Sequence, residues 1–234
     1  MPNDLASEKT PRLYFKSLRE QVYDYLREEL YAGRILPNSS LNLKALSTHL
    51  GVSITPLRDA LLRMEQEGFV TILPRKGVIV NSLTLQDVKN FYQIIGALEG
   101  EVIKSVFQLL SSQHVARMKK LNDQMREALN KDAFDAYYQL NIAFHDAFIA
   151  LSDNMALRPL LMPMKQRLYD FQRRPYVKPW EFRNCLEHDQ FIDSILKKDQ
   201  DKAVNVIRDV HWSFSVQEEY IREFYRVETR LNAK

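Results

Sequence analysis

The chain has 234 residues, of which 45% are apolar, and this is enough for one large domain or two small ones with a real core. Its formal net charge of +3 is spread evenly, with 11 Lys and Arg against 9 Asp and Glu up to residue 80 and 22 against 21 after it, so bulk charge decides nothing about a nucleic-acid partner. No apolar run approaches membrane-spanning length and the N-terminus lacks signal-peptide order, so we expect a soluble, cytoplasmic chain, and the single cysteine, Cys185, agrees with a reducing compartment.

Residues 1–80 predict three helices separated by glycine turns. A first helix over residues 16–32 carries apolar residues at helical spacing, namely Leu18, Val22, Tyr25, Leu26 and Leu30. A short second helix ends at Gly51, and a third runs over about residues 55–66, with Ser53 as its N-cap and Pro56 in its first turn.

The next segment predicts a β-hairpin. Apolar and polar residues alternate on both sides of residues 74–77, which indicates two short strands joined by a basic tip. The order of helix, helix, turn, helix and hairpin is that of a winged helix-turn-helix. We therefore expect a DNA-binding domain over residues 1–80.

In such a domain the third helix enters the major groove, and its N-terminal residues meet base edges and phosphates. Ser53 and Thr55 are expected to contact DNA directly, and Arg58 can reach a guanine edge or a phosphate. We expect the flanking DNA backbone to be bound by Arg63, Arg75 and Lys76, with Gly77 allowing its close approach. The residues predicted to be buried on the opposite side of the helix are Leu57, Leu61, Leu62 and Met64.

The stretch "LNLKALSTHLGVSITPLRDALLRMEQEGFVTILPRKGVIV" resembles the DNA-binding domain of the GntR family of bacterial transcription regulators. The resemblance implies that Arg58 and the Thr55-Pro56 pair keep their family roles, and that Lys44 stands where a basic residue often contacts DNA. Ile54 occupies a position that is commonly arginine. Operator preference is therefore expected to differ from that of relatives.

From residue 81 onward the pattern predicts an all-α effector-binding and dimerisation domain, residues 81–234. The expected helices are residues 84–110, 112–130, 132–151, 154–174, 179–197 and 200–231, with Pro163 inside the fourth. The overall fold class is thus mainly α, a winged helix-turn-helix followed by a helical bundle.

Three histidines face the predicted core of this second domain. Asn141 and His145 lie one turn apart on the inner arc of their helix, while His188 and His211 lie on the apolar arcs of two others. Burying three imidazoles and an amide is costly unless they share partners. A divalent metal would satisfy all four, although histidines that are merely hydrogen-bonded in a metal-free core remain an alternative.

The segments "NIAFHDAF", "EHDQFIDSI" and "AVNVIRDVHWSF" resemble the FCD ligand-binding domain of one large GntR subgroup. The resemblance implies a divalent metal held by Asn141, His145, His188 and His211, with Zn²⁺ expected and Mn²⁺ or Ni²⁺ as alternatives. Asn141 replaces a frequent aspartate, so weaker metal binding is expected.

The same resemblance bears on the effector. Ile95-Gly96 stand where many members carry an arginine that grips an effector carboxylate. If an organic acid is the effector, Arg167, Arg173 and Arg174 are the candidates to bind it. The expected protein is a homodimeric regulator of a palindromic operator. A metal-dependent hydrolase with an appended nucleic-acid module is the alternative, with Glu187 and Asp189 as the nearest candidates for a general base.

Overall fold

The computed structural model describes residues 16–170 and 176–231. This part of the chain separates into two compact units, one made of residues 16–30 and 35–81 and the other of residues 31–34 and 82–231. None of the helices within it is long and apolar enough to span a lipid bilayer.

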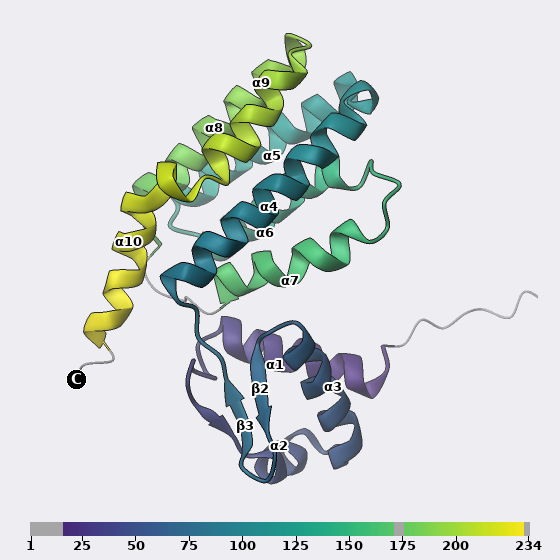
Figure 1. Ribbon diagram of the computed structural model, residues 1–234, viewed down its shortest axis with the longest axis vertical. Helices are drawn as coiled ribbons and strands as arrows, with labels where there is room; N and C mark the ends of the chain where they lie inside the picture. Colours follow the sequence, from purple (N-terminus) through teal and green to yellow (C-terminus); the bar gives the residue numbers. More distant parts are fainter. Residues whose placement is uncertain (1–15, 171–175, 232–234) are drawn as a thin grey trace, which may run out of the picture. The chain divides into compact units, whose positions relative to one another are not determined.

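The first unit is a winged helix-turn-helix, as the sequence predicts (Figure 1). Its elements are α1 (Leu18–Tyr31), β1 (Ser40–Leu41), α2 (Leu43–Leu50), α3 (Ile54–Gln66), β2 (Val70–Leu73) and β3 (Gly77–Val80). The three strands are antiparallel in the order β1-β3-β2, so β3 lies in the middle. The pattern had not indicated β1, because two residues are too few to show alternation.

Local signals explain where α2 and α3 begin and end. Asn42 caps α2 by accepting a hydrogen bond from the backbone N–H of Ala45 at 3.0 Å. Gly51 ends the helix in the left-handed region, at φ 65°, where a side chain would be strained. Ser53 is the N-cap residue of α3, but its side chain makes no capping hydrogen bond. Its hydroxyl is therefore not committed to the helix that it precedes.

The core of the first unit differs in two places from the prediction. The buried residues of α3 are Leu57, Ala60, Leu61 and Met64. Leu62 was predicted to be buried, but this is wrong, since it is 45% exposed on the face that also carries Arg58. Leu18, expected on the apolar face of the first helix, is exposed because it is the first residue of α1 and lies beyond the core.

The second unit is a helical bundle, again as predicted. Its elements are α4 (Leu85–Val106), a 3₁₀ turn (Phe107–Leu109), α5 (Ser112–Asn130), α6 (Phe134–Ile149), α7 (Leu157–Asp170), α8 (Lys178–Leu196), α9 (Gln200–Asn205), a π-helix (Val206–His211) and α10 (Phe214–Leu231). The long α4 contacts α6, α7, α9, α10 and the π-helix, and Figure 1 shows it crossing the bundle. Pro163 lies inside α7, as expected.

The segment 200–231 was predicted to be one helix, and this is wrong. It is divided into α9, the π-helix and α10, with a break at Trp212 and Ser213. A π-helix has the same local composition as an α-helix, so apolar periodicity does not reveal it.

Two glycines of α4 allow the π-helix to pack directly on that helix. A Cβ on Gly96 would lie 2.9 Å from Trp212 Cβ and 3.2 Å from the carbonyl oxygen of Arg208. A Cβ on Gly100 would lie 3.3 Å from the side chain of Arg208. The two backbones can therefore approach each other closely because Gly96 and Gly100 have no side chain.

Candidate functional site

The exposed face of α3 carries the side chains that the sequence assigned to DNA. Ser53, Thr55 and Arg58 are all exposed. Ile54 and Leu62, spaced four residues from Arg58 on either side, share its face and are 41% and 45% exposed. Lys44 is exposed on α2. The reading face of the helix is thus one arginine between two aliphatic side chains.

Arg63 differs from Arg58 in having partners inside its own unit. Its Nε donates to Glu67 Oε1 at 2.9 Å, and its guanidinium lies 3.8 Å from the ring centroid of Tyr23. An arginine held in this way contributes charge near the DNA backbone, but it has less freedom to follow a base edge.

The wing presents its basic residues at a tight turn between β2 and β3. Arg75 and Lys76 are exposed, and the backbone N–H of Lys76 donates to Leu73 O at 3.0 Å. Gly77 has φ 100°, which favours glycine, and Arg75 has φ 61°. The turn therefore projects two cations away from the sheet.

In the second unit the structure brings the three predicted histidines together. His145 comes from α6, His188 from α8 and His211 from the end of the π-helix, and all three are buried. One ring nitrogen of each lies within 4.8 Å of those of the other two. This spacing allows one ion to contact all three nitrogens.

Each histidine is oriented by a hydrogen bond at Nδ1. His145 Nδ1 lies 2.8 Å from Glu99 Oε2, and His211 Nδ1 lies 3.0 Å from Glu187 Oε2. Because an ionised carboxylate only accepts hydrogen bonds, both Nδ1 atoms carry the proton. Their Nε2 atoms are then the ones with free lone pairs.

The third histidine reaches the same tautomer through an amide. His188 Nδ1 lies 3.2 Å from Asn122 Oδ1. Asn122 Nδ2 donates to Cys185 O at 2.9 Å and to Asp189 Oδ1 at 2.7 Å, and these two acceptors fix its amide with the oxygen toward His188. His188 Nε2 is therefore also a lone-pair donor for a metal.

Three buried donor atoms of α6 and α8 have no hydrogen-bond partner within the described residues, namely Asn141 Oδ1, His145 Nε2 and His188 Nε2. Asn141 precedes His145 by about one turn of α6, and its Nδ2 donates to the hydroxyl of Tyr169 at 3.0 Å. Buried polar atoms without partners are costly. The three clustered histidines, two of them with an unsatisfied Nε2, fit a divalent ion.

Electrostatics favours neutral imidazoles in this cluster. Burial lowers the pKa of His145 to about 4 and the pKa of His188 well below its ordinary value. Burial alone would raise the pKa of Glu99, but His145 and Lys165 together bring it below its ordinary value. Neutral imidazoles with an ionised carboxylate behind them are the protonation states that metal binding requires.

Glu99 links the cluster to two further elements. It forms a buried ion pair with Lys165 of α7, and its Oε2 accepts a hydrogen bond from Trp212 Nε1 at 2.8 Å. Trp212 also packs against Gly96 of α4. One carboxylate thus fixes His145, Lys165 and Trp212 together.

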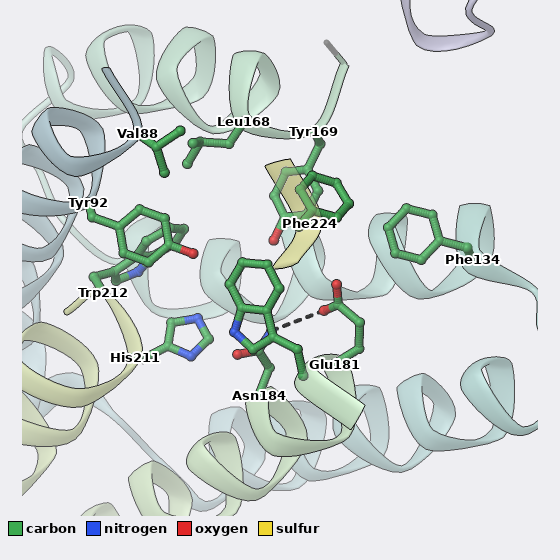
Figure 2. A pocket seen from close by; sticks show the side chains of 11 residues that line it. Val88, Tyr92, Phe134, Leu168, Tyr169, Glu181, Asn184, His211, Trp212 and Phe224 are labelled. Carbon is green, nitrogen blue, oxygen red and sulfur yellow. Dashed lines mark hydrogen bonds between the residues drawn. The ribbon is translucent and has the colours of Figure 1, made fainter. Parts of the chain in front are cut away.

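A cavity of about 40 Å³ opens beside His211 (Figure 2). Its lining is mostly aromatic and consists of Val88, Tyr92, Phe134, Leu168, Tyr169, Trp180, Glu181, Asn184, His211, Trp212 and Phe224. An apolar lining with a few polar groups is typical of small-molecule sites, and this cavity is smaller than most of them.

The predicted effector arginines are not part of this lining as far as the structure describes them. Arg167 packs on the ring of Phe91 with its guanidinium carbon 4.8 Å from the centroid. Arg173 and Arg174 lie outside the described residues. Their assignment to the effector stays a prediction.

Family comparisons agree with both units. The description "Bacterial regulatory proteins, gntR family" matches residues 18–80, and "FCD domain" matches residues 90–211, which is more than half of the chain. The chain therefore belongs to the GntR family of bacterial regulatory proteins, in the group with an FCD domain. It is a DNA-binding transcription regulator, and both resemblances drawn from the sequence are confirmed.

Among curated proteins the chain is similar to several regulators. It is 25% identical to the uncharacterized HTH-type transcriptional regulator YdhC of Bacillus subtilis, over 78% of this chain and 83% of that protein. It is 24% identical to McbR of Escherichia coli over 86% of this chain and 92% of that protein. Its match to the E. coli repressor RspR, at 25% identity, covers 58% of this chain and 60% of RspR.

Solved structures show the same fold. E. coli McbR/YncC superposes with a TM-score of 0.72 at 20% identity, covering 92% of this chain and 100% of that chain. A putative GntR regulator from Rhodococcus sp. RHA1 gives a TM-score of 0.69 at 15% identity, covering 88% of this chain and 97% of that chain. At these identities the likeness concerns architecture alone.

Sequence reasoning missed the residues that orient the candidate metal ligands. Glu99, Asn122 and Tyr169 belong to no pattern that the sequence analysis singled out. Glu187 was considered as a base rather than as the partner of His211. The acidic or amide residue that faces each histidine from another helix can be found only when the packing of the helices is known.

Proposed function

We propose that this regulator binds a palindromic operator as a homodimer, and that a small molecule bound beside a divalent metal in the FCD domain controls that binding. Zn²⁺ is the expected ion, with Mn²⁺ or Ni²⁺ as alternatives, and Asn141, His145, His188 and His211 would hold it. The observation that carries the proposal is the convergence of three buried histidines, two of which have an Nε2 atom without a hydrogen-bond partner among the described residues. A divalent ion held by these four ligands would take an oxygen of the effector as an additional ligand, by expansion beyond four-coordination.

The residues around the histidine cluster would have different roles in binding the metal and the effector. Glu99, Glu187 and Asn122 hold the three imidazoles in the tautomer that leaves Nε2 available. Tyr169 accepts a hydrogen bond from Asn141 Nδ2, which would leave the amide oxygen available to the metal. The aromatic side chains of the cavity exclude water from the ligand. These tasks are those of binding and orientation.

The effector would act through the elements that line the cavity. Its lining comes from α4, α6, α7, α8, the π-helix and α10, so a ligand there contacts most of the bundle at once. A ligand shifts an equilibrium only by binding the two states with different affinity. The operator-binding arrangement of the dimer would be the one that the effector favours or disfavours.

The geometry favours a regulator over the hydrolase alternative. The carboxylate of Glu187 pairs with Arg183 and accepts from His211 and Gln217. Asp189 pairs with Arg126 and accepts from Asn122. Both candidate bases are thus engaged behind the histidines. A general base must instead reach the reacting proton directly or through one water.

The test is metal content paired with thermal stability. Protein purified without added metal should contain about one ion per chain by elemental analysis, or should gain thermal stability when Zn²⁺, Mn²⁺ or Ni²⁺ is added. His188→Ala should abolish both effects, and His49→Ala, at an exposed position on α2, is the control. If the native chain neither contains nor responds to any of these ions, the metal is excluded and the histidines are hydrogen-bonded core residues.

A further inference from the structure

Glu181 is an exception among the buried acidic residues. Three glutamates are buried in the described part of the chain, namely Glu99, Glu181 and Glu187. Glu99 has the ammonium of Lys165, and Glu187 has the guanidinium of Arg183 with Nε at 3.1 Å. Glu181 forms no ion pair with a lysine or arginine among the described residues.

The neighbours of Glu181 are neutral or weakly basic groups. Asn184 Nδ2 donates to Glu181 Oε2 at 3.0 Å, and the phenol of Tyr137 lies close to the carboxyl. Burial raises the pKa of Glu181 to about 7, since no cation offsets the loss of hydration. A buried carboxylate without a counter-charge is costly in free energy, and a cationic ligand would remove that cost.

Glu181 lines the same small cavity as His211. Figure 2 shows His211 with Tyr92 and Trp212 on one side of the view and Glu181 on the other. Six aromatic residues line the space, namely Tyr92, Phe134, Tyr169, Trp180, Trp212 and Phe224. Aromatic faces attract ammonium groups, and the attraction grows when water is excluded.

The lining contains no lysine or arginine among the described residues. A ligand carboxylate would therefore find no cationic side chain in the described lining of the cavity, apart from the proposed metal at the histidine end. An ammonium would find both aromatic rings and a carboxylate. The cavity of about 40 Å³ also restricts the ligand to a few heavy atoms unless side chains move.

We propose that the effector carries a protonated amine, which lies among the aromatic rings and pairs with Glu181. Combined with the proposed metal beside His211, this makes a short amino acid the class of effector, with its carboxylate at the metal end and its ammonium at Glu181. The placement of the ligand carboxylate at the metal rests on the proposed function, whereas the pairing of the ligand ammonium with Glu181 is independent of it.

The experiment compares matched ligands on the full-length, metal-loaded protein. Calorimetry would be run with glycine, β-alanine and 4-aminobutanoate, with acetate, propanoate and butanoate, and with methylamine, ethylamine and propylamine. At least one amino acid should bind about tenfold more tightly than the acid of equal chain length, as expected for a hydrogen bond between charged groups. The best chain length then reports the separation of the two ends.

Glu181→Gln should remove that advantage and leave the affinity for the plain acid unchanged. The exposed Glu219→Gln on α10 is the control and should behave as the native chain. Because no cationic partner is lost, the ligand-free Glu181→Gln protein should unfold at the same temperature as the native chain or higher. Retained metal content in the variant would show that the bundle is intact.

The proposal is overturned if plain acids bind as tightly as the amino acids, if Glu181→Gln leaves amino-acid binding unchanged, or if no amine or amino acid binds. Repeating the titrations after chelation separates the two proposals. Binding of simple amines that persists after chelation and is lost in Glu181→Gln keeps the ammonium site whatever the metal content of the native chain. Binding of acids to the metal-loaded protein alone, with no added affinity from an amine, keeps the metal site and rejects the ammonium site.

Discussion

The amide nitrogen of Asn141 on α6 donates a hydrogen bond to the hydroxyl of Tyr169 on α7, and the amide oxygen of Asn141 is buried without a partner among the described residues. Rotation of the amide by half a turn would present the nitrogen instead, which cannot coordinate a cation. Tyr169→Phe is therefore expected to lower metal affinity by about tenfold, as loss of an outer partner does in other metal sites.

Metal titration followed by calorimetry would measure this change. Tyr176→Phe is a suitable control, because its hydroxyl contacts the exposed Asp132 instead. Equal affinities of the native chain and Tyr169→Phe would mean that the amide needs no external support.

Asn141→Asp should strengthen metal binding. The amide oxygen is a neutral ligand, while a carboxylate at the same position adds a negative charge next to the cation. The added charge should also repel a ligand whose own carboxylate binds the metal, so the affinities for metal and effector should move in opposite directions. Sequential titration of metal and effector into both proteins would show this, and parallel changes would place the effector away from the metal.

Arg58→Ala should weaken specific operator binding by about 1–3 kcal/mol and relax the preference at one base pair, because a bidentate contact to guanine would be lost. Arg63→Ala should change affinity less and equally for all sequences, since Arg63 is held by Glu67 and Tyr23. Binding of both variants to a randomised operator library would compare them. A uniform loss for Arg58→Ala would assign it to a phosphate.

Replacing Arg75 and Lys76 together by alanine should reduce the salt dependence of DNA binding. Each phosphate contact contributes about 0.9 to the slope of log affinity against log salt, so the loss should approach two units. Fluorescence titrations at four or five salt concentrations are sufficient. An unchanged slope would show that the wing does not touch the backbone.

The pH dependence of the metal-free protein contains two opposing contributions. The pKa of His145 is lowered by burial to about 4, so the unfolded chain takes up a proton that the folded chain does not, and unfolding free energy falls as pH drops from about 6.5 to 4. The pKa of Glu181 is raised by burial to about 7, so the folded chain keeps a proton that the unfolded chain releases, and unfolding free energy falls as pH rises from about 4.5 to 7.

Glu181→Gln should therefore make the chelated protein lose stability more steeply on acidification between about pH 6.5 and 4.5. One proton corresponds to about 1.4 kcal/mol per pH unit. Thermal midpoints of the native chain and the variant at pH 7, 6 and 5 would be compared. Identical pH profiles would mean that Glu181 titrates alike in the folded and unfolded chains.

Sequence was sufficient for the fold because strong local signals agree with one another. Gly51 ends one helix, Ser53 precedes the next, and apolar spacing marks most of the bundle. Leu62 shows the limit, since an apolar residue on the edge of a helical arc faces solvent when the neighbouring element does not cover it. Apolar periodicity therefore locates the buried face of a helix, but it does not show which residues at the edge of that face are covered.

The three clustered histidines were identified because histidine is rare and its place on a helix can be calculated. The groups that orient them were not, because each comes from another helix: Glu99 from α4, Asn122 from α5 and Tyr169 from α7. Glu181 was missed for a different reason. Glu181 is notable because it lacks a cationic partner among the described residues, and the lack of a contact cannot be read from a sequence.

The π-helix that ends in His211 also sets the rotation of that residue about the helix axis relative to α9. An α-helix advances by about 100° per residue, and a π-turn contains one residue more than an α-turn, so residues after the π-turn are out of phase with α9 by roughly that angle. Tightening of this turn to an α-turn would rotate the imidazole of His211 away from its present direction, whereas the break at Trp212 and Ser213 separates α10 from that rotation. An ion held by the imidazole would therefore keep the extra residue in the turn.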